Sequence, residues 1–88
     1  MANAYEISED GTSQEIEVTR ETLSSNGVYC IIDDSNKNII LWKGRESHVR
    51  KKFAGAHMAS RLRNEQGTGF RVLPLDEGEE PSDFLSSD

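Results

Sequence analysis

The histidine, cysteine and acidic residues are the side chains of this sequence that could hold a metal ion or react with a substrate. His48 and His57 are nine residues apart and project from different faces of a helix, so with one cysteine they cannot form a zinc site. Cys30 lies within an apolar stretch, where we expect a small buried hydrophobic residue. Asp33 and Asp34 lie in a turn, and the sequence places no nucleophile or base beside them. The sequence therefore predicts no active site, and we expect a protein that is not an enzyme.

Length and composition limit the class of protein further. The chain has 88 residues, enough for one domain with a compact core. Its net charge of −6 argues against a general affinity for nucleic acid. One cysteine excludes an internal disulfide and gives no support for secretion. The N-terminus has no signal pattern, and no apolar run approaches the roughly 18 residues of a membrane span. We expect a cytoplasmic protein with a single domain over residues 1–88.

Charge is distributed unevenly along the chain. Seven of the ten Lys and Arg residues lie in 43–63, where Glu46 is the one acid, whereas both ends of the chain are acidic. Cations at 50–52 fall in the first turns of a predicted helix, where each opposes the helix macrodipole at a cost of up to about 1 kcal/mol. Local rules are often broken at functional sites, so this basic helix is the surface expected to bind a partner. The alternative is an ordinary solvated helix face.

Five stretches predict β-strands, namely 4–8, 15–18, 28–32, 39–42 and 70–75. The first two alternate between apolar and polar residues, which is typical of strands with one exposed face. Residues 28–32 and 39–42 are apolar at every position, so they are expected to be central strands that are covered on both faces. The polar turn at 33–38 would join these two strands into an antiparallel hairpin.

Residues 46–65 predict a five-turn helix, with Ser47 as its N-cap and Gly67 as its stop. Its core-facing stripe consists of small or apolar residues within about 60° of one line, with Val49 and Met58 on its shoulders. The stripe comprises Gly55, Ala56, Ala59 and Leu62. Phe53 lies beyond the stripe, and it is either exposed or folded down beside Val49 at the margin of the sheet.

Pro81 favours the start of a second, short helix that runs through Leu85. The expected fold is therefore α/β in the α+β sense, with a five-stranded mixed sheet between one long helix and one short C-terminal helix. The initial Met1 and the polar tail at 86–88 favour a complete small protein over an excised repeat.

Three blocks of the sequence resemble gelsolin-like domains. Residues 39–44 (Ile-Ile-Leu-Trp-Lys-Gly), followed by a charged helix rich in alanine, resemble the family's strand–Trp–Lys–Gly–helix segment. Residues 73–84 (Leu-Pro-Leu-Asp-Glu-Gly-Glu-Glu-Pro-Ser-Asp-Phe) resemble its closing strand, acidic turn and short helix. Residues 4–8 and 23–29 resemble its opening strand and the approach to a central strand. The blocks occur in order over nearly the whole chain, which resembles one domain of the gelsolin, villin and severin family.

The resemblance implies a cytoskeleton-associated protein that binds actin monomers or filaments through the outer face of its long helix and modulates assembly. The positions on that face are Arg50, Phe53, Ala54, His57, Arg61 and Asn64. Basic stretches in this family also bind phosphoinositide headgroups, and the corresponding candidates for contact with anionic lipid are Lys43, Arg45, Lys51 and Lys52. Two alternatives stay open: an adaptor at a membrane surface that uses the basic helix, and a structural spacer.

Calcium is where the sequence departs from the family pattern. The usual intradomain site takes a backbone carbonyl and an Asp at the start of a central strand, plus a Glu from the long helix. The Asp and Glu positions fall on Val28 and Lys51, which supply no oxygen ligand to a hard cation. We expect this site to be absent and no cofactor to be required. Asp33, Asp34 and Glu77 are weaker candidates for a different or actin-shared site, and solvated turn acids are the favoured interpretation.

Overall fold

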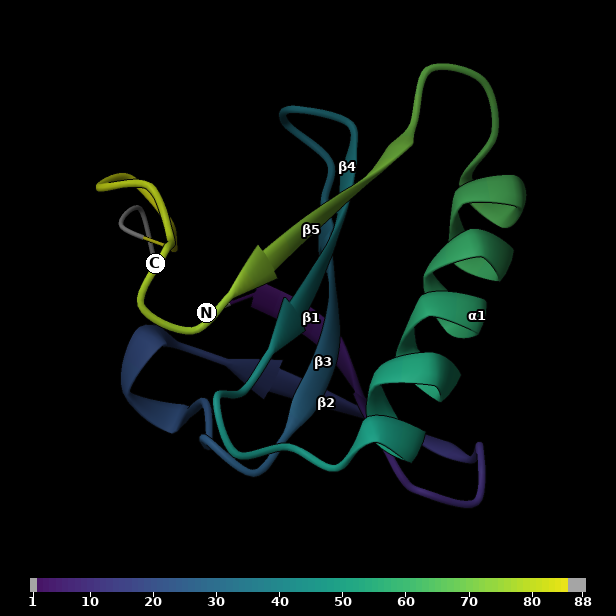
Figure 1. Cartoon of the computed structure of the whole chain (residues 1–88). Helices are drawn as coiled ribbons and strands as arrows, with labels where there is room; N and C mark the ends of the chain where they lie inside the picture. Colours follow the sequence, from purple (N-terminus) through teal and green to yellow (C-terminus); the bar gives the residue numbers. More distant parts are fainter. Residues whose placement is uncertain (1, 86–88) are drawn as a thin grey trace.

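The protein is described here by a computed structural model of residues 2–85, in which one long helix packs on a five-stranded sheet (Figure 1). The elements are β1 (Ala2–Ile7), β2 (Ser13–Val18), the short 3-10 helix η1 (Arg20–Thr22), β3 (Val28–Asp33), β4 (Asn38–Lys43), α1 (Val49–Gln66) and β5 (Arg71–Asp76). The strand order is β2-β1-β3-β4-β5. Strand β5 runs parallel to β4 and the other pairs are antiparallel, so the predicted mixed sheet is confirmed.

Strands β3 and β4 form the centre of the sheet, as their continuous apolar sequences predict. They pair as an antiparallel hairpin in which Val28 lies opposite Lys43 and Asp33 lies opposite Asn38. Every residue from 28 to 31 and from 38 to 42 is buried. The polar turn between the strands therefore has the role that the sequence predicts for it.

Hydrophobic side chains cover both faces of the sheet. The cluster on the α1 side comprises Ile7, Val28, Cys30, Ile39, Leu41, Ala59 and Leu62. The cluster on the opposite side comprises Ala4, Val18, Tyr29, Ile31, Ile40, Trp42 and Phe84. Cys30 is fully buried, as predicted, and its Sγ lies 3.4 Å from the carbonyl oxygen of Gly55 in α1. Burial raises the pKa of the Cys30 thiol to about 12.

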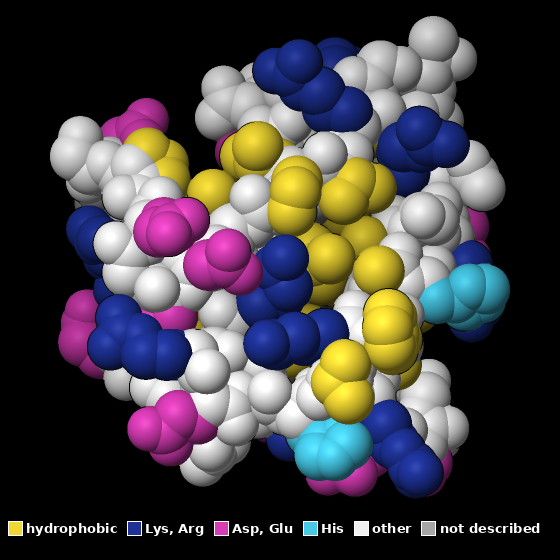
Figure 2. All heavy atoms as spheres, in the orientation of Figure 1, with side chains coloured by type: hydrophobic (Ala, Val, Ile, Leu, Met, Phe, Trp, Pro, Cys, Tyr) yellow, Lys and Arg dark blue, Asp and Glu magenta, His cyan; other side chains and the backbone are white. Residues whose placement is uncertain are grey.

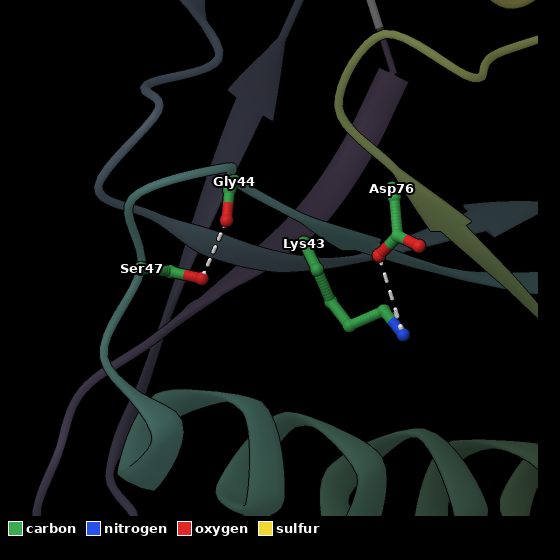
Figure 3. A network of polar contacts seen from close by, with 4 residues as sticks. All are labelled: Lys43, Gly44, Ser47 and Asp76. Atoms are coloured by element: carbon green, nitrogen blue, oxygen red, sulfur yellow. Dashed lines mark hydrogen bonds and ion pairs between the residues drawn. The ribbon is translucent and has the colours of Figure 1, made fainter.

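Helix α1 begins later than predicted, at Val49. Its N-cap is His48, whose Nδ1 accepts a 3.0 Å hydrogen bond from the Arg50 amide. The prediction of Ser47 as N-cap is wrong, because its hydroxyl donates to the Gly44 carbonyl oxygen at 2.7 Å, within the turn before the helix (Figure 3). Histidine is not among the strongly preferred N-cap residues, which is why the sequence favours Ser47 at this position.

Gly67, at the end of α1, and Leu85, at the end of the described residues, both have a positive φ. Gly67 has φ 99° and donates its amide to the Arg63 carbonyl oxygen, which confirms it as the helix stop. The predicted short helix from Pro81 is wrong for the described residues, which form a turn there with a 3.0 Å bond from the Phe84 amide to the Pro81 carbonyl oxygen. Leu85 has φ 53°, a left-handed conformation that an α-helix does not continue through.

Candidate functional site

The orientation of α1 decides which of its residues are available to a partner. Three of the four predicted stripe residues are buried, but Ala56 is exposed. Met58 and Ala54 are half-buried and pack against the core cluster on the other side of the stripe. Compared with the prediction, the buried face of the helix is rotated toward Met58. This rotation moves Val49 and Ala56 out to the exposed side.

Phe53 is exposed to the extent of 72%, and Val49, one helical turn before it, to 53%. Within residues 2–85 these are the exposed large hydrophobic side chains. The alternative in which Phe53 folds down beside Val49 at the sheet margin is therefore wrong. An exposed phenylalanine on a well-packed helix is a feature that protein interfaces often use as an anchor.

Most of the residues predicted for the outer face do lie on the surface of α1. Arg50, His57, Arg61 and Asn64 are exposed together with Phe53. Ala54 is the exception, because it is half-buried at the margin of the core. Lys and Arg side chains surround hydrophobic side chains over the α1 side of the molecule (Figure 2). Sequence reasoning missed Val49 as a member of this face, although its spacing of four residues from Phe53 was the available signal.

The cations of the outer face are not neutralised within the domain. In the described part of the chain, the guanidinium groups of Arg50 and Arg61 have neither an ion pair nor a hydrogen bond. Their charges therefore remain available to acidic groups of a partner, where they can increase the association rate. The outer face of α1 thus combines an aromatic anchor with unpaired positive charge.

The second set of basic residues is arranged differently. Lys43 Nζ lies 3.5 Å from Asp76 Oδ1, between α1 and the sheet (Figure 3). Lys51 Nζ donates to the carbonyl oxygen of Asn26 at 3.1 Å. Arg45 lies beside the carboxylate of Glu77, and its backbone amide donates to that carboxylate. Lys52 is the one of the four whose side chain has no polar partner among residues 2–85. The four residues therefore do not form one free cationic cluster, and contact with anionic lipid stays a prediction.

The acidic turn after β5 is hydrogen-bonded to β4 and to the loops beside it. The Glu77 carboxylate accepts hydrogen bonds from the Arg45 amide at 2.8 Å and the Ser25 hydroxyl at 2.7 Å, which together lower its pKa. Glu80 Oε2 accepts a 2.7 Å bond from Trp42 Nε1, and this bond is the main cause of the lowered pKa of Glu80. The acids of this turn are thus structural partners, not only solvated charges.

At the two positions that the family resemblance assigns to the usual calcium site, the side chains supply no oxygen ligand, and the absence of that site stays a prediction. Val28 is fully buried with an apolar side chain, and the Lys51 position carries an ammonium group. The weaker candidates are not close together: Asp33 lies opposite Asn38, whereas Glu77 follows Asp76 at the other end of the paired strands. Within residues 2–85 no group of three or more His, Cys, Asp or Glu side chains could hold a metal ion.

Among the described residues, no helix has both the length and the apolar character that crossing a bilayer requires.

Comparison with known proteins gives matches among solved structures. No model of a protein family and no curated protein matches the sequence. The structure of Thorarchaeota ProGel in complex with rabbit actin matches with a TM-score of 0.88 and 32% sequence identity, over 99% of this chain and 98% of that one. Thorarchaeota 2DGel3, also in complex with rabbit actin, matches with a TM-score of 0.77 and 25% identity, over 97% of this chain and 44% of that one.

The match to ProGel combines a TM-score of 0.88 over nearly the whole of both chains with 32% sequence identity. In this structure, the three sequence blocks that resemble gelsolin-like domains lie on β4 with α1, on β5 with the acidic turn, and on β1 with the approach to β3. This chain belongs to the family of gelsolin-like domains.

Proposed function

We propose that this protein binds actin, as monomer or filament, through the outer face of α1 and thereby modulates actin assembly. The observation that carries the proposal is Phe53, which is 72% exposed on the helix face to which the family resemblance assigns actin binding. The two similar structures described above are both complexes with actin. The proposal includes a cytoplasmic, cytoskeleton-associated location, a role without catalysis, and membership of the gelsolin, villin and severin group.

The chemistry of the surface fits a partner with an apolar pocket and acidic surroundings. Phe53 exposes an aromatic ring on a regular helix, so little conformational entropy is lost when it is bound. Arg50 and Arg61 are unpaired in the described chain and can meet carboxylates around the pocket. Burial of an aromatic anchor is the type of contact that contributes most to binding at protein interfaces.

The test is to remove the anchor and the charge separately. Phe53→Ala should weaken actin binding by about 2 kcal/mol, which is roughly thirtyfold in Kd. Arg61→Glu should also weaken it, and more strongly at low salt. Because both side chains are exposed, the melting temperature should change little. Binding is measured by co-sedimentation with filaments and by pyrene-actin assembly.

Arg20→Glu is the matched control for charge reversal, since Arg20 lies in η1 near Phe84, on the face of the sheet opposite α1. It should bind actin like the wild type. If the wild type affects neither monomers nor filaments at tens of micromolar protein, actin binding is refuted. If actin is bound but Phe53→Ala and Arg61→Glu both bind normally, the assignment of the helix face is wrong.

A further inference from the structure

Lys51 makes a contact that its position in the sequence does not explain. It lies in the first turn of α1, where a cation opposes the helix macrodipole. Its Nζ reaches across to the carbonyl oxygen of Asn26, at 3.1 Å, in the turn that precedes β3. Lys52 follows in the same helical turn, and its side-chain ammonium has no polar partner in the described residues. The contact is therefore specific to one of two adjacent lysines.

The turn that receives Lys51 is itself held firmly in place. The Gly27 carbonyl oxygen accepts a 2.9 Å bond from the Gly44 amide, and the Ser25 carbonyl oxygen accepts one of 2.9 Å from the Glu46 amide. These bonds join the turn to the segment between β4 and α1, which runs beside it (Figure 1). The Asn26 carbonyl is consequently a fixed acceptor, and a cation on α1 that binds it fixes the start of the helix relative to the sheet.

In the family pattern, the same two places, the start of a central strand and the first turns of the long helix, contribute the ligands of a calcium ion. In this chain they carry Val28, which is fully buried and apolar, and Lys51. A calcium ion therefore does not fit, but the link between the two elements is still present. We propose that the Lys51 ammonium takes the place of the metal ion and positions α1 for actin binding without calcium.

Because actin is the partner assumed, this inference rests on the proposed function, but its first test does not need actin. Lys51→Met keeps the apolar stem of the side chain and removes only the ammonium. In the free protein, amide hydrogen exchange of residues 24–28 and of the first turn of α1 should become about two- to tenfold faster. Lys51→Arg keeps a cationic donor and should restore slow exchange. Lys52→Met removes the same charge one residue later and should exchange like the wild type.

The second test measures actin affinity in 1 mM calcium chloride and in excess chelator. The wild type should have the same Kd in both, and Lys51→Met should bind about two- to tenfold more weakly in both. Exchange in Lys51→Met as slow as in Lys52→Met, saturable calcium binding by the wild type in calorimetry, or actin binding only in calcium would each overturn the inference. If no variant binds actin in either buffer, the proposed function fails, while the exchange data still decide whether Lys51 forms the link.

Discussion

Replacing Gly55 with alanine adds one methyl group where α1 lies against β3 and β4. A Cβ atom at this position would lie 2.6 Å from Val28 Cγ1 and 3.0 Å from Leu41 Cδ1. Real Cβ atoms essentially never approach another heavy atom as closely as 2.6 Å, so a neighbour has to move. Val28 and Leu41 are both buried in the cluster between the sheet and the helix. The methyl group can therefore be accommodated only if α1 moves away or the core repacks.

Two opposing effects set the magnitude. Alanine is favoured over glycine inside a helix by about 1 kcal/mol. Overfilling a well-packed core costs about 1–3 kcal/mol. The difference is a net destabilisation of roughly 1 kcal/mol, where helix propensity alone would give a stabilisation of similar size. For a domain of this length, such a loss lowers the melting temperature by about 4–8 °C.

Urea unfolding followed by the fluorescence of the buried Trp42 measures this change. Ser60→Ala is the control, because Ser60 is exposed on the same helix and gains only from propensity. Val28→Ala should cost less stability in the Gly55→Ala background than in the wild type, since it removes the atom that the new methyl group meets. A stabilisation of about 1 kcal/mol by Gly55→Ala, with an unchanged denaturant slope, would show that the helix is not packed this closely.

Two further predictions concern ionisable groups. Because the pKa of Glu80 is lowered in the folded chain, its carboxylate contributes stability above the ordinary value of 4.5, and this contribution is lost as the pH falls through the folded-state value. On acidification, the melting temperature of Glu80→Gln should therefore fall less steeply than that of the wild type. The control is Glu79→Gln at the exposed neighbouring residue, whose melting temperature should follow that of the wild type. Identical curves for all three proteins would contradict the role of the Trp42 bond. Burial raises the pKa of Cys30 from 9.0 to about 12, so the reactive thiolate is much rarer than in an exposed cysteine. A thiol reagent at pH 8 should thus modify the native chain far more slowly than the urea-unfolded chain, and equal rates would refute the burial of Cys30.

The sheet was largely predictable because its strands carry strong local patterns. Residues 28–32 and 39–42 are apolar throughout, which only strands covered on both faces sustain, and the turn at 33–38 left one way to pair them. The place of β1 between β2 and β3 was not predictable in the same way. That order depends on pairing between residues distant in sequence, such as Tyr5 and Cys30, for which no local signal exists.

The exposed face of α1 was predictable only in part, because small residues define the orientation of a helix poorly. Ala56 and Ala59 have small side chains, so burying or exposing either one changes the free energy of folding little. Both therefore fit the predicted core stripe. The structure buries Ala59 and exposes Ala56, since Met58 and Leu62 place the larger apolar surface on the other side. The rotation left Phe53 in solvent, an outcome that sequence periodicity had left undecided.

The basic character of residues 43–63 has two physical origins that composition alone does not separate. Lys43 and Lys51 are used within the domain, where they connect to Asp76 and to the Asn26 carbonyl at the ends of the strands. Arg50 and Arg61 have no such partners in the described chain and project from the outer face of α1. The Lys43 ion pair joins β4 to β5 and the Lys51 bond joins α1 to the turn before β3, whereas Arg50 and Arg61 are available to a partner. A surface assigned by counting charges would have included all four residues, whereas the contacts separate two cations that join elements of the domain from two that can bind a partner.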